Sequence, residues 1–130
     1  MEFGLSSEQI LLQDSVNRFL AEQVPLDVVR KIAADDSSDA NCWSGLTDLG
    51  IPGLLISEAN GGLGLSSLDA AVVSELLGYH VTPSPFISSA VIAPATMQAA
   101  GRGEDLLGSV ATGETRIGIA FAEGIASRNN

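Results

Sequence analysis

Three glycines within four positions are the residues whose spacing could bind a phosphate group. Gly61, Gly62 and Gly64 stand in the stretch SEANGGLGLSS (residues 57–67), directly after the apolar segment GLLI. Glycine-rich loops between a strand and a helix can hold phosphates on backbone N–H groups. A dinucleotide fingerprint, however, requires Gly-x-Gly-x-x-Gly inside a βαβ unit, and Ser67 stands where the third glycine is needed. We therefore interpret this stretch as a tight structural turn.

Other combinations of residues that could do chemistry are incomplete. His80 is the only histidine, and Glu75 is the only acidic residue within ten positions of it, so a set of metal ligands is missing. A serine hydrolase of the common type would need a Gly-x-Ser-x-Gly elbow, which does not occur. The acidic pairs at 35–36 and 104–105 are expected to be solvated or to lie in the first turn of a helix. Residue types and spacing alone predict neither catalytic residues nor a metal site.

The charge balance excludes one large class of function. Sixteen acidic residues face six basic ones in a chain of 130 residues, which gives a net charge of −10. A protein that binds nucleic acid needs Lys and Arg to replace counterions along the phosphates, so no nucleic-acid partner is expected. An anionic ligand, such as a nucleotide or a CoA thioester, would have to find much of its positive charge on other protein segments.

The composition also predicts a compact protein that does not cross a membrane. Hydrophobic residues make up 45% of the chain, enough for an aliphatic core, and Cys42, the only cysteine, excludes an internal disulfide. The N-terminal MEFGLSSEQ lacks the basic and apolar regions of a signal peptide. Residues 76–101 carry no formal charge but contain three prolines, which makes them a poor membrane-spanning helix. A cytoplasmic location is expected.

Periodicity and capping signals predict about six helices. Ser6 with Gln9, and Ser66 with Asp69, have the spacing of capping boxes at helix N-termini. Apolar residues at helical spacing follow each of them. The predicted helices span residues 6–24, 26–34, 41–49, 66–77, 84–100 and 104–112, and Gly50, Gly78 and Gly113 are expected to end the third, fourth and sixth of them.

Prolines refine this prediction. Ser84 is expected at the N-cap of the fifth helix, with Pro85 at its first position. Pro94 lies inside that helix and predicts a kink or a break, because it lacks an N–H group and its ring clashes with the carbonyl four residues earlier. The apolar residues 51–57 are expected to be extended.

The spacing of apolar residues changes near the end of the sequence. Ile117, Ile119 and Phe121 alternate with small residues, which is typical of a β-strand. A single strand needs a sheet to satisfy its backbone groups, and no earlier segment offers one. The sequence therefore predicts an all-α helical domain at residues 1–113, followed at 114–130 by the first strand of an absent β-domain.

The order of these pieces resembles the acyl-CoA dehydrogenases. Residues 49–78, LGIPGLLISEANGGLGLSSLDAAVVSELLG, look like the most recognisable N-terminal stretch of that family: a Leu-Gly helix end, an apolar run, a Gly-Gly-x-Gly turn and a helix ending in Leu-Gly. MEFGLSSEQILLQDSVNRFLAEQV is similar to the family's first helix, and TPSP and LLGSVATGETRIGIAFAE follow in register. The resemblance covers essentially the whole chain and is more specific than any single motif.

This resemblance implies a fold and an activity. The family fold is an N-terminal helical bundle, a middle β-domain and a C-terminal four-helix domain, so this chain would be the first of these plus one strand of the second. The family dehydrogenates acyl-CoA thioesters: a carboxylate removes the α proton, hydride passes from the β carbon to FAD, and electrons leave through an electron-transfer flavoprotein. The catalytic carboxylate belongs to the C-terminal part. The chain alone is therefore expected to be inactive and not to retain FAD.

Flavin contacts in the family lie on the first strand of the middle domain. By position they correspond here to Ile119, Phe121 and Ala122. Ala122-Glu123 stands where the family has Thr-Glu, and Ala122 lacks the hydroxyl that Thr offers to the flavin.

The helix after TPSP lines the inner end of the acyl pocket in the family. Position and helical spacing imply that Phe86, Ser89, Ala90 and Ala93 bind substrate, and core packing is the alternative role for all four.

The sequence does not fix the assembly. The resemblance implies a homo-oligomer or a heterotetramer with a related subunit. Ser57 in place of Pro, and Tyr79 in place of Arg, suit a divergent branch of the family. One alternative is a non-catalytic helical subunit that docks on a complete dehydrogenase. Another, a dinucleotide-binding domain, would require a parallel sheet.

Overall fold

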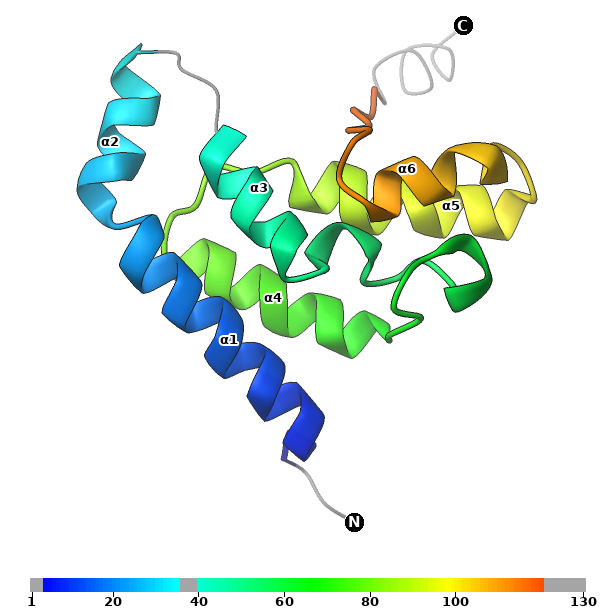
Figure 1. Ribbon diagram of the computed structural model, residues 1–130, viewed down its shortest axis with the longest axis horizontal. Helices are drawn as coiled ribbons and strands as arrows, with labels where there is room; N and C mark the ends of the chain where they lie inside the picture. The colour runs from blue at the N-terminus through cyan, green and yellow to red at the C-terminus, as the bar shows by residue number, and fades with distance from the viewer. Residues whose placement is uncertain (1–3, 36–39, 121–130) are drawn as a thin grey trace, which may run out of the picture.

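The computed structural model describes residues 4–35 and 40–120, and this part of the chain is all-α, as predicted. Six α-helices follow one another in it, joined by short 3-10 and π segments (Figure 1). The α-helices are α1 (Ser7–Gln23), α2 (Leu26–Asp35), α3 (Ala40–Asp48), α4 (Ser67–Tyr79), α5 (Ala93–Ala100) and α6 (Leu107–Ala111). The short segments are η1 (Ile51–Gly53), η2 (Glu58–Asn60), η3 (Phe86–Ile92) and η4 (Glu104–Leu106).

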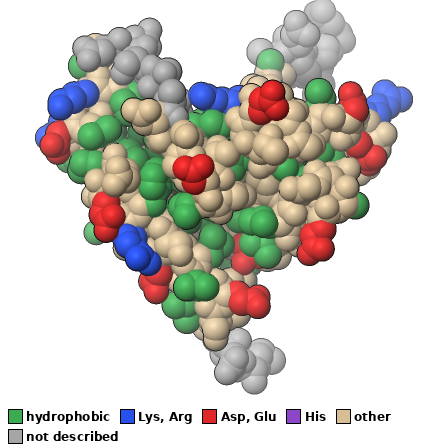
Figure 2. Space-filling model, viewed as in Figure 1, with side chains coloured by type: hydrophobic (Ala, Val, Ile, Leu, Met, Phe, Trp, Pro, Cys, Tyr) green, Lys and Arg blue, Asp and Glu red, His purple; other side chains and the backbone are tan. Residues whose placement is uncertain are grey.

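The main core joins five of these elements, one of which, η1, contributes Ile51. Val16 and Leu20 of α1 pack with Leu46 of α3, Val73 of α4 and Phe86 of η3, and each of the five is at least 99% buried. Figure 1 shows α1 lying across α4, whereas α2 extends to one corner of the molecule. On the face shown in Figure 2, charged side chains lie mainly along the outline and hydrophobic ones are scattered among polar groups.

Both predicted capping boxes are present. The Ser6 N–H donates to Gln9 Oε1 at 3.0 Å, and the Gln9 N–H donates to Ser6 Oγ at 3.2 Å, where α1 begins. At the start of α4, the Ser66 N–H donates to Asp69 Oδ2 at 2.8 Å. These bonds satisfy donors that the first turn of a helix leaves unpaired, and Pro25 follows the end of α1 as expected.

Residues 51–57 do not form the predicted extended segment. The N–H groups of Gly53, Leu54 and Ile56 each donate to the carbonyl three residues earlier, so the chain winds into tight turns instead. Leu54 and Ile56 are fully buried. The prediction was wrong because a short run of apolar residues buried on all sides has the same pattern whether it is extended or wound.

The glycine stretch is a structural turn, as predicted. The N–H groups of Gly61, Gly62 and Gly64 donate to the carbonyls of Glu58, Ser57 and Ile56, respectively. Gly61 and Gly64 have positive φ angles, and a Cβ atom on Gly62 would overlap the Ile56 carbonyl. Because these N–H groups are used within the chain, they are not available to cradle a phosphate.

One side chain fastens this turn to α5. Gln98 Nε2 donates to the Leu55 carbonyl at 3.0 Å, and the Ser57 N–H donates to Gln98 Oε1 at 3.0 Å. A single amide therefore satisfies two backbone groups of the loop, one donor and one acceptor.

The predicted fifth helix consists of two helices with different winding. η3 is a π-helix whose N-cap is Pro85, so the prediction of Ser84 was wrong, and α5 begins at Ala93. Pro94 offers no N–H group and its ring excludes the regular carbonyl position. The Ala93 N–H accordingly bonds to the Ser88 carbonyl, five residues earlier. Pro94 divides the helix, as expected.

The last helix is divided too, into η4 and α6, and Gly113 follows it with a φ of +72°, as predicted. No strand is present among the described residues, which include 117–120; Phe121 and the rest of the predicted strand lie outside them. The domain boundary between 113 and 114 stays a prediction. Within residues 4–35 and 40–120, no helix is long and apolar enough to span a membrane.

Candidate functional site

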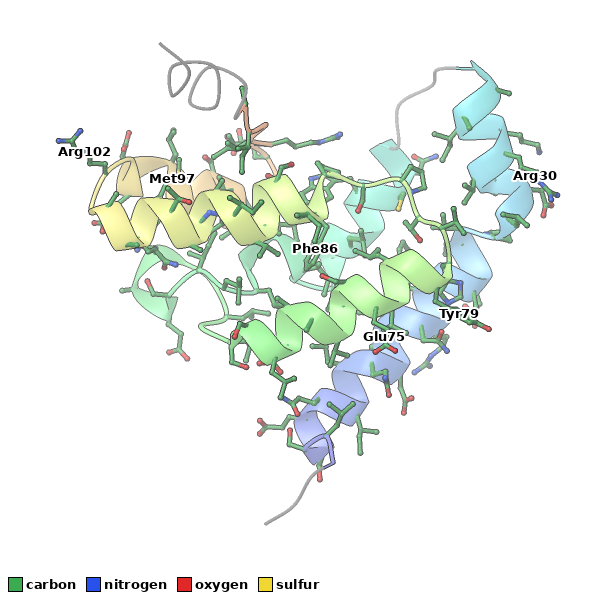
Figure 3. All side chains as sticks on the ribbon, turned by 180° about the vertical axis from the view of Figure 1, so that it is seen from behind. Arg30, Glu75, Tyr79, Phe86, Met97 and Arg102 are labelled. Carbon is green, nitrogen blue, oxygen red and sulfur yellow. The ribbon has the colours of Figure 1, made fainter. Side chains whose placement is uncertain are left out.

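Two hollows open beside the helices that carry the predicted substrate-binding residues. The larger, ≈ 420 Å³, lies between the end of α4 and the start of η3, and we call it the α4–η3 hollow. Leu77, Val81, Thr82, Phe86 and Ile87 contribute to its lining. Figure 3 shows Phe86 between η3 and α4. The smaller, ≈ 250 Å³, is the α5 groove, which is lined by Ile92, Ala93, Thr96, Met97, Ile117 and Ile119.

The residue that ends α4 in the left-handed conformation is Val81, not Gly78 as predicted, and the helix runs through Tyr79. The Thr82 N–H donates to the Leu77 carbonyl at 2.8 Å, and the Val81 N–H donates to the Gly78 carbonyl at 3.1 Å, which is a Schellman motif. Val81 has a φ of +53°, which strains a β-branched residue. It is also 61% exposed, so a strained residue presents an apolar side chain at the rim of the hollow.

One residue that lines the α4–η3 hollow, Thr82, carries an unsatisfied polar atom. Thr82 Oγ1 is buried and has no hydrogen-bond partner in the described part of the chain. The nearby Ser74 hydroxyl, in contrast, donates to the Ala70 carbonyl of its own helix at 2.8 Å. An unsatisfied buried hydroxyl costs about 1–3 kcal/mol.

The α5 groove is almost wholly apolar, because its floor belongs to a second core cluster. Ile56, Leu107 and Val110 are fully buried, and Met97 and Ile117 pack against them. Met97 projects from α5 in Figure 3. The groove is therefore suited to an uncharged hydrocarbon or to the face of an aromatic ring.

Four contacts hold the segment that follows α6 against the helices. The Thr115 N–H donates to the Ser109 carbonyl of α6 at 3.0 Å. Trp43 Nε1 donates to the Gly113 carbonyl at 3.1 Å. The guanidinium carbon of Arg116 lies 5.8 Å from the centroid of the Trp43 ring, within the range of a cation–π contact. The Ile117 N–H donates to Ser89 Oγ at 3.1 Å. α3, α6 and η3 thereby fix the path of the chain into the α5 groove.

The four residues predicted to bind substrate are all at least 95% buried. Phe86 contributes to the α4–η3 hollow and Ala93 to the α5 groove, whereas Ser89 and Ala90 line neither. The structure does not bring the four to one surface, and their role in substrate binding stays a prediction.

Of the predicted flavin contacts, Ile119 lies in the α5 groove, and Phe121 and Ala122 lie outside the described residues. The sequence reasoning missed Val81 and Thr82. No signal in GYHVTPSP separates a left-handed valine from an ordinary loop residue.

Charged and metal-ligating groups are sparse around both hollows. Among the described residues, no three His, Cys, Asp or Glu side chains could hold a metal ion. His80 Nε2 lies 2.8 Å from Asn17 Oδ1, which joins α4 to α1. The hydrogen bonds that Asp69 accepts, chiefly the one from the Ser66 hydroxyl, lower its pKa and together outweigh the opposite effect of burial.

Comparison with known proteins identifies the family. The profile of the acyl-CoA dehydrogenase N-terminal domain matches residues 6–113, a span that includes all six helices. This chain belongs to the acyl-CoA dehydrogenase family. The all-α fold is thus that of the N-terminal domain of acyl-CoA dehydrogenases, and the resemblance noted in the sequence is confirmed.

A curated acyl-CoA dehydrogenase is similar over most of the chain. The acyl-CoA dehydrogenase IpdE2 of Mycolicibacterium smegmatis (strain ATCC 700084 / mc(2)155) is 32% identical over 104 residues, which are 78% of this chain and 33% of that protein. The chain therefore spans about a third of the length of this relative. No solved structure matches.

Proposed function

We propose that this chain is the N-terminal helical part of an FAD-dependent acyl-CoA dehydrogenase, which forms the α,β double bond of an acyl-CoA thioester in the cytoplasm. The observation that carries the proposal is the family match over residues 6–113. The name of the similar protein from Mycolicibacterium smegmatis supports the same reaction class. The catalytic base is assigned to another part of the enzyme, so the 130-residue chain alone is inactive.

In the proposed enzyme, this chain lines the substrate pocket with apolar side chains and supplies none of the groups that react. Phe86 and Ala93 contact the acyl part of the substrate from the α4–η3 hollow and the α5 groove. Ser89 and Ala90 of η3 are fully buried and line neither hollow. Apolar walls of this kind bind a hydrocarbon chain and keep water away from the reacting carbons.

The described residues fit a flavin along one apolar wall only. No charged side chain lines the α5 groove. Figure 3 shows Arg30 and Arg102 at opposite ends of the molecule, so these two cations do not meet around a pyrophosphate. Ile119, Phe121 and Ala122 would hold the ring system, with the remaining contacts on other segments. FAD supplies the hydride acceptor of the reaction.

Partners follow from the same proposal. The complete enzyme passes electrons to an electron-transfer flavoprotein and assembles as a homo-oligomer or as a heterotetramer with a related subunit. Leu68, Tyr79 and Ile87 are 54%, 80% and 51% exposed and are available for such contacts.

The test is a visible absorption spectrum of two purified proteins, this chain and the protein of its longest natural reading frame. A flavin band in the longer protein alone is expected, and the band should bleach when octanoyl-CoA or butyryl-CoA is added without oxygen. A longer protein that binds FAD but is not bleached by any acyl-CoA thioester contradicts the proposed reaction.

The exposed apolar side chains favour a second candidate, a non-catalytic helical subunit that docks on a complete dehydrogenase. In that case the longer protein carries no flavin when purified alone and co-purifies with a yellow flavoprotein. The same spectra therefore separate the two candidates.

A further inference from the structure

The Ser89 hydroxyl binds the backbone of a segment that lies 28 residues further along the sequence. Ser89 is fully buried, and its Oγ accepts the Ile117 N–H at 3.1 Å. The surrounding helix η3 has π winding, which often marks a functional position. A buried hydroxyl placed opposite a backbone N–H group fixes a direction, which apolar packing alone does not do.

The segment that Ser89 holds has two faces. Ile117 and Ile119 are half-buried in the α5 groove, whereas Gly118 and Ala120 are exposed. In an extended segment, a slip by one residue exchanges the two faces. Such a slip would place Gly118 and Ala120 in the groove and both isoleucines in solvent.

The other three anchors of this segment act before residue 117, and one of them is the Thr115 N–H, which donates to the Ser109 carbonyl of α6 at 3.0 Å. Trp43 binds Gly113, four residues before Ile117, and Arg116 reaches the Trp43 ring with a long, flexible side chain. Among the described residues, the bond to Ser89 is the hydrogen bond that acts on the backbone of residues 117–119, inside the groove.

We propose that Ser89 is a positioning residue, which sets the register of residues 117–119 against α5 and so orients Ile119. This inference rests on the proposed function for its consequence, because that function places Ile119 against the flavin. Ser89 touches neither substrate nor flavin in this role; it acts through the backbone of Ile117.

The first experiment measures hydrogen exchange of the Ile117 amide in the 130-residue chain by NMR. Ser89→Ala should speed this exchange roughly five- to tenfold, as expected for the loss of one hydrogen bond. Ser88→Ala is the matched control, because it removes a hydroxyl from the same helix whose partner is the Pro85 carbonyl, at 3.1 Å. Equal exchange of Ile117 in the two variants overturns the proposal.

A third variant separates the hydrogen bond from the packing. Ser89→Cys fills nearly the same volume with a weak acceptor. Exchange at Ile117 should stay fast in this variant. Exchange restored to the wild-type rate would mean that filling the site, and not the hydroxyl, holds the segment.

The second experiment uses the protein of the longest natural reading frame. Ser89→Ala should weaken FAD binding several-fold and change the visible circular dichroism of the flavin, whereas Ser88→Ala should change neither. Wild-type flavin properties in Ser89→Ala overturn the link to the flavin even if exchange at Ile117 rises. A wild-type protein without flavin contradicts the proposed function instead, and hydrogen exchange then decides the register by itself.

Discussion

Both α4 and α6 are followed by a residue in the left-handed conformation, but this residue is a valine after α4 and a glycine after α6. α4 ends with Val81 at φ +53°, and α6 ends with Gly113 at φ +72°. After α6, Gly113 lies so close to the Thr47 side chain that a Cβ atom would overlap it, and the Gly113 carbonyl accepts the Trp43 N–H. After α4, the valine projects into solvent beside a hollow with an unsatisfied hydroxyl.

Each of these turns is a joint between a helix and the next segment. The α6 joint, at Gly113, fixes the direction of the segment that follows, whereas the α4 joint, at Val81, leaves an apolar side chain exposed beside the hollow. The end of α6 is relaxed and tied to α3 by the Trp43 hydrogen bond, as expected for a joint that must aim the next segment. The end of α4 retains strain and exposes an apolar group. Backbone strain of this kind is concentrated at sites of function. The α4–η3 hollow is therefore the region to test for binding, and the turn after α6 is the region to test for rigidity.

The strongest way to break the α6 joint is Trp43→Ala. Trp43 is 2% exposed, and its removal should lower the free energy of unfolding by about 3–5 kcal/mol. Urea denaturation followed by far-UV circular dichroism measures this loss. Trp43→Phe keeps most of the volume without the N–H donor and should lose less. A loss below about 1 kcal/mol in Trp43→Ala would show that the joint does not depend on this anchor.

Gly113→Ala tests the same joint with one methyl group. The change adds left-handed strain of about 1–2 kcal/mol, and the new methyl also overlaps the Thr47 side chain. Gly101→Ala is the matched control, because Gly101 has a φ of +59° and open space where the Cβ atom would stand. Gly113→Ala should lower the melting temperature clearly more than Gly101→Ala. Equal shifts would mean that Thr47 moves aside freely.

The α4 joint predicts a change of the opposite sign. Val81→Asn should raise the free energy of unfolding by up to about 1 kcal/mol, because Asn tolerates the left-handed region better than a β-branched residue. Thermal unfolding of the 130-residue chain measures the effect. A lower melting temperature would show that the Val81 side chain stabilises the hollow by more than its backbone strain costs.

The smallest expected effect lies at the other end of α4 and depends on pH. The pKa of Asp69 is lowered, chiefly by the Ser66 hydroxyl, so the folded state favours the carboxylate. Its contribution to stability is present above the ordinary aspartate pKa of about 3.9 and is lost as the pH falls through the lowered value. The difference in unfolding free energy between wild type and Asp69→Asn should therefore shrink with acidification below about pH 4. A constant difference contradicts this assignment.

The parts of the fold that the sequence predicts are those set by near neighbours. Ser66 and Asp69 stand three residues apart, and their capping box followed from spacing alone. Pro94 divides its helix for a reason contained in its own ring. The glycine turn was also predicted, because glycine tolerates positive φ angles.

The candidate site depends on contacts that no local pattern reports. Ser89 meets Ile117 across 28 residues, and Trp43 meets Gly113 across 70. The left-handed Val81 was missed because the hydrogen bonds of the Schellman motif at the end of α4 hold it against the residue's own preference. Placing these residues requires the packed structure.

The two hydrogen bonds of Gln98 imply an order of folding. Leu55 and Ser57 find their partner 43 and 41 residues further along the chain, so the turn around the glycines is not complete until α5 has docked. Long-range pairing of this kind is slow compared with the formation of a helix. During synthesis, which proceeds from the N-terminus, α1 to α3 can form while this turn still lacks its partner. The glycine turn, although its sequence pattern is local, is then among the last parts of the domain to fold.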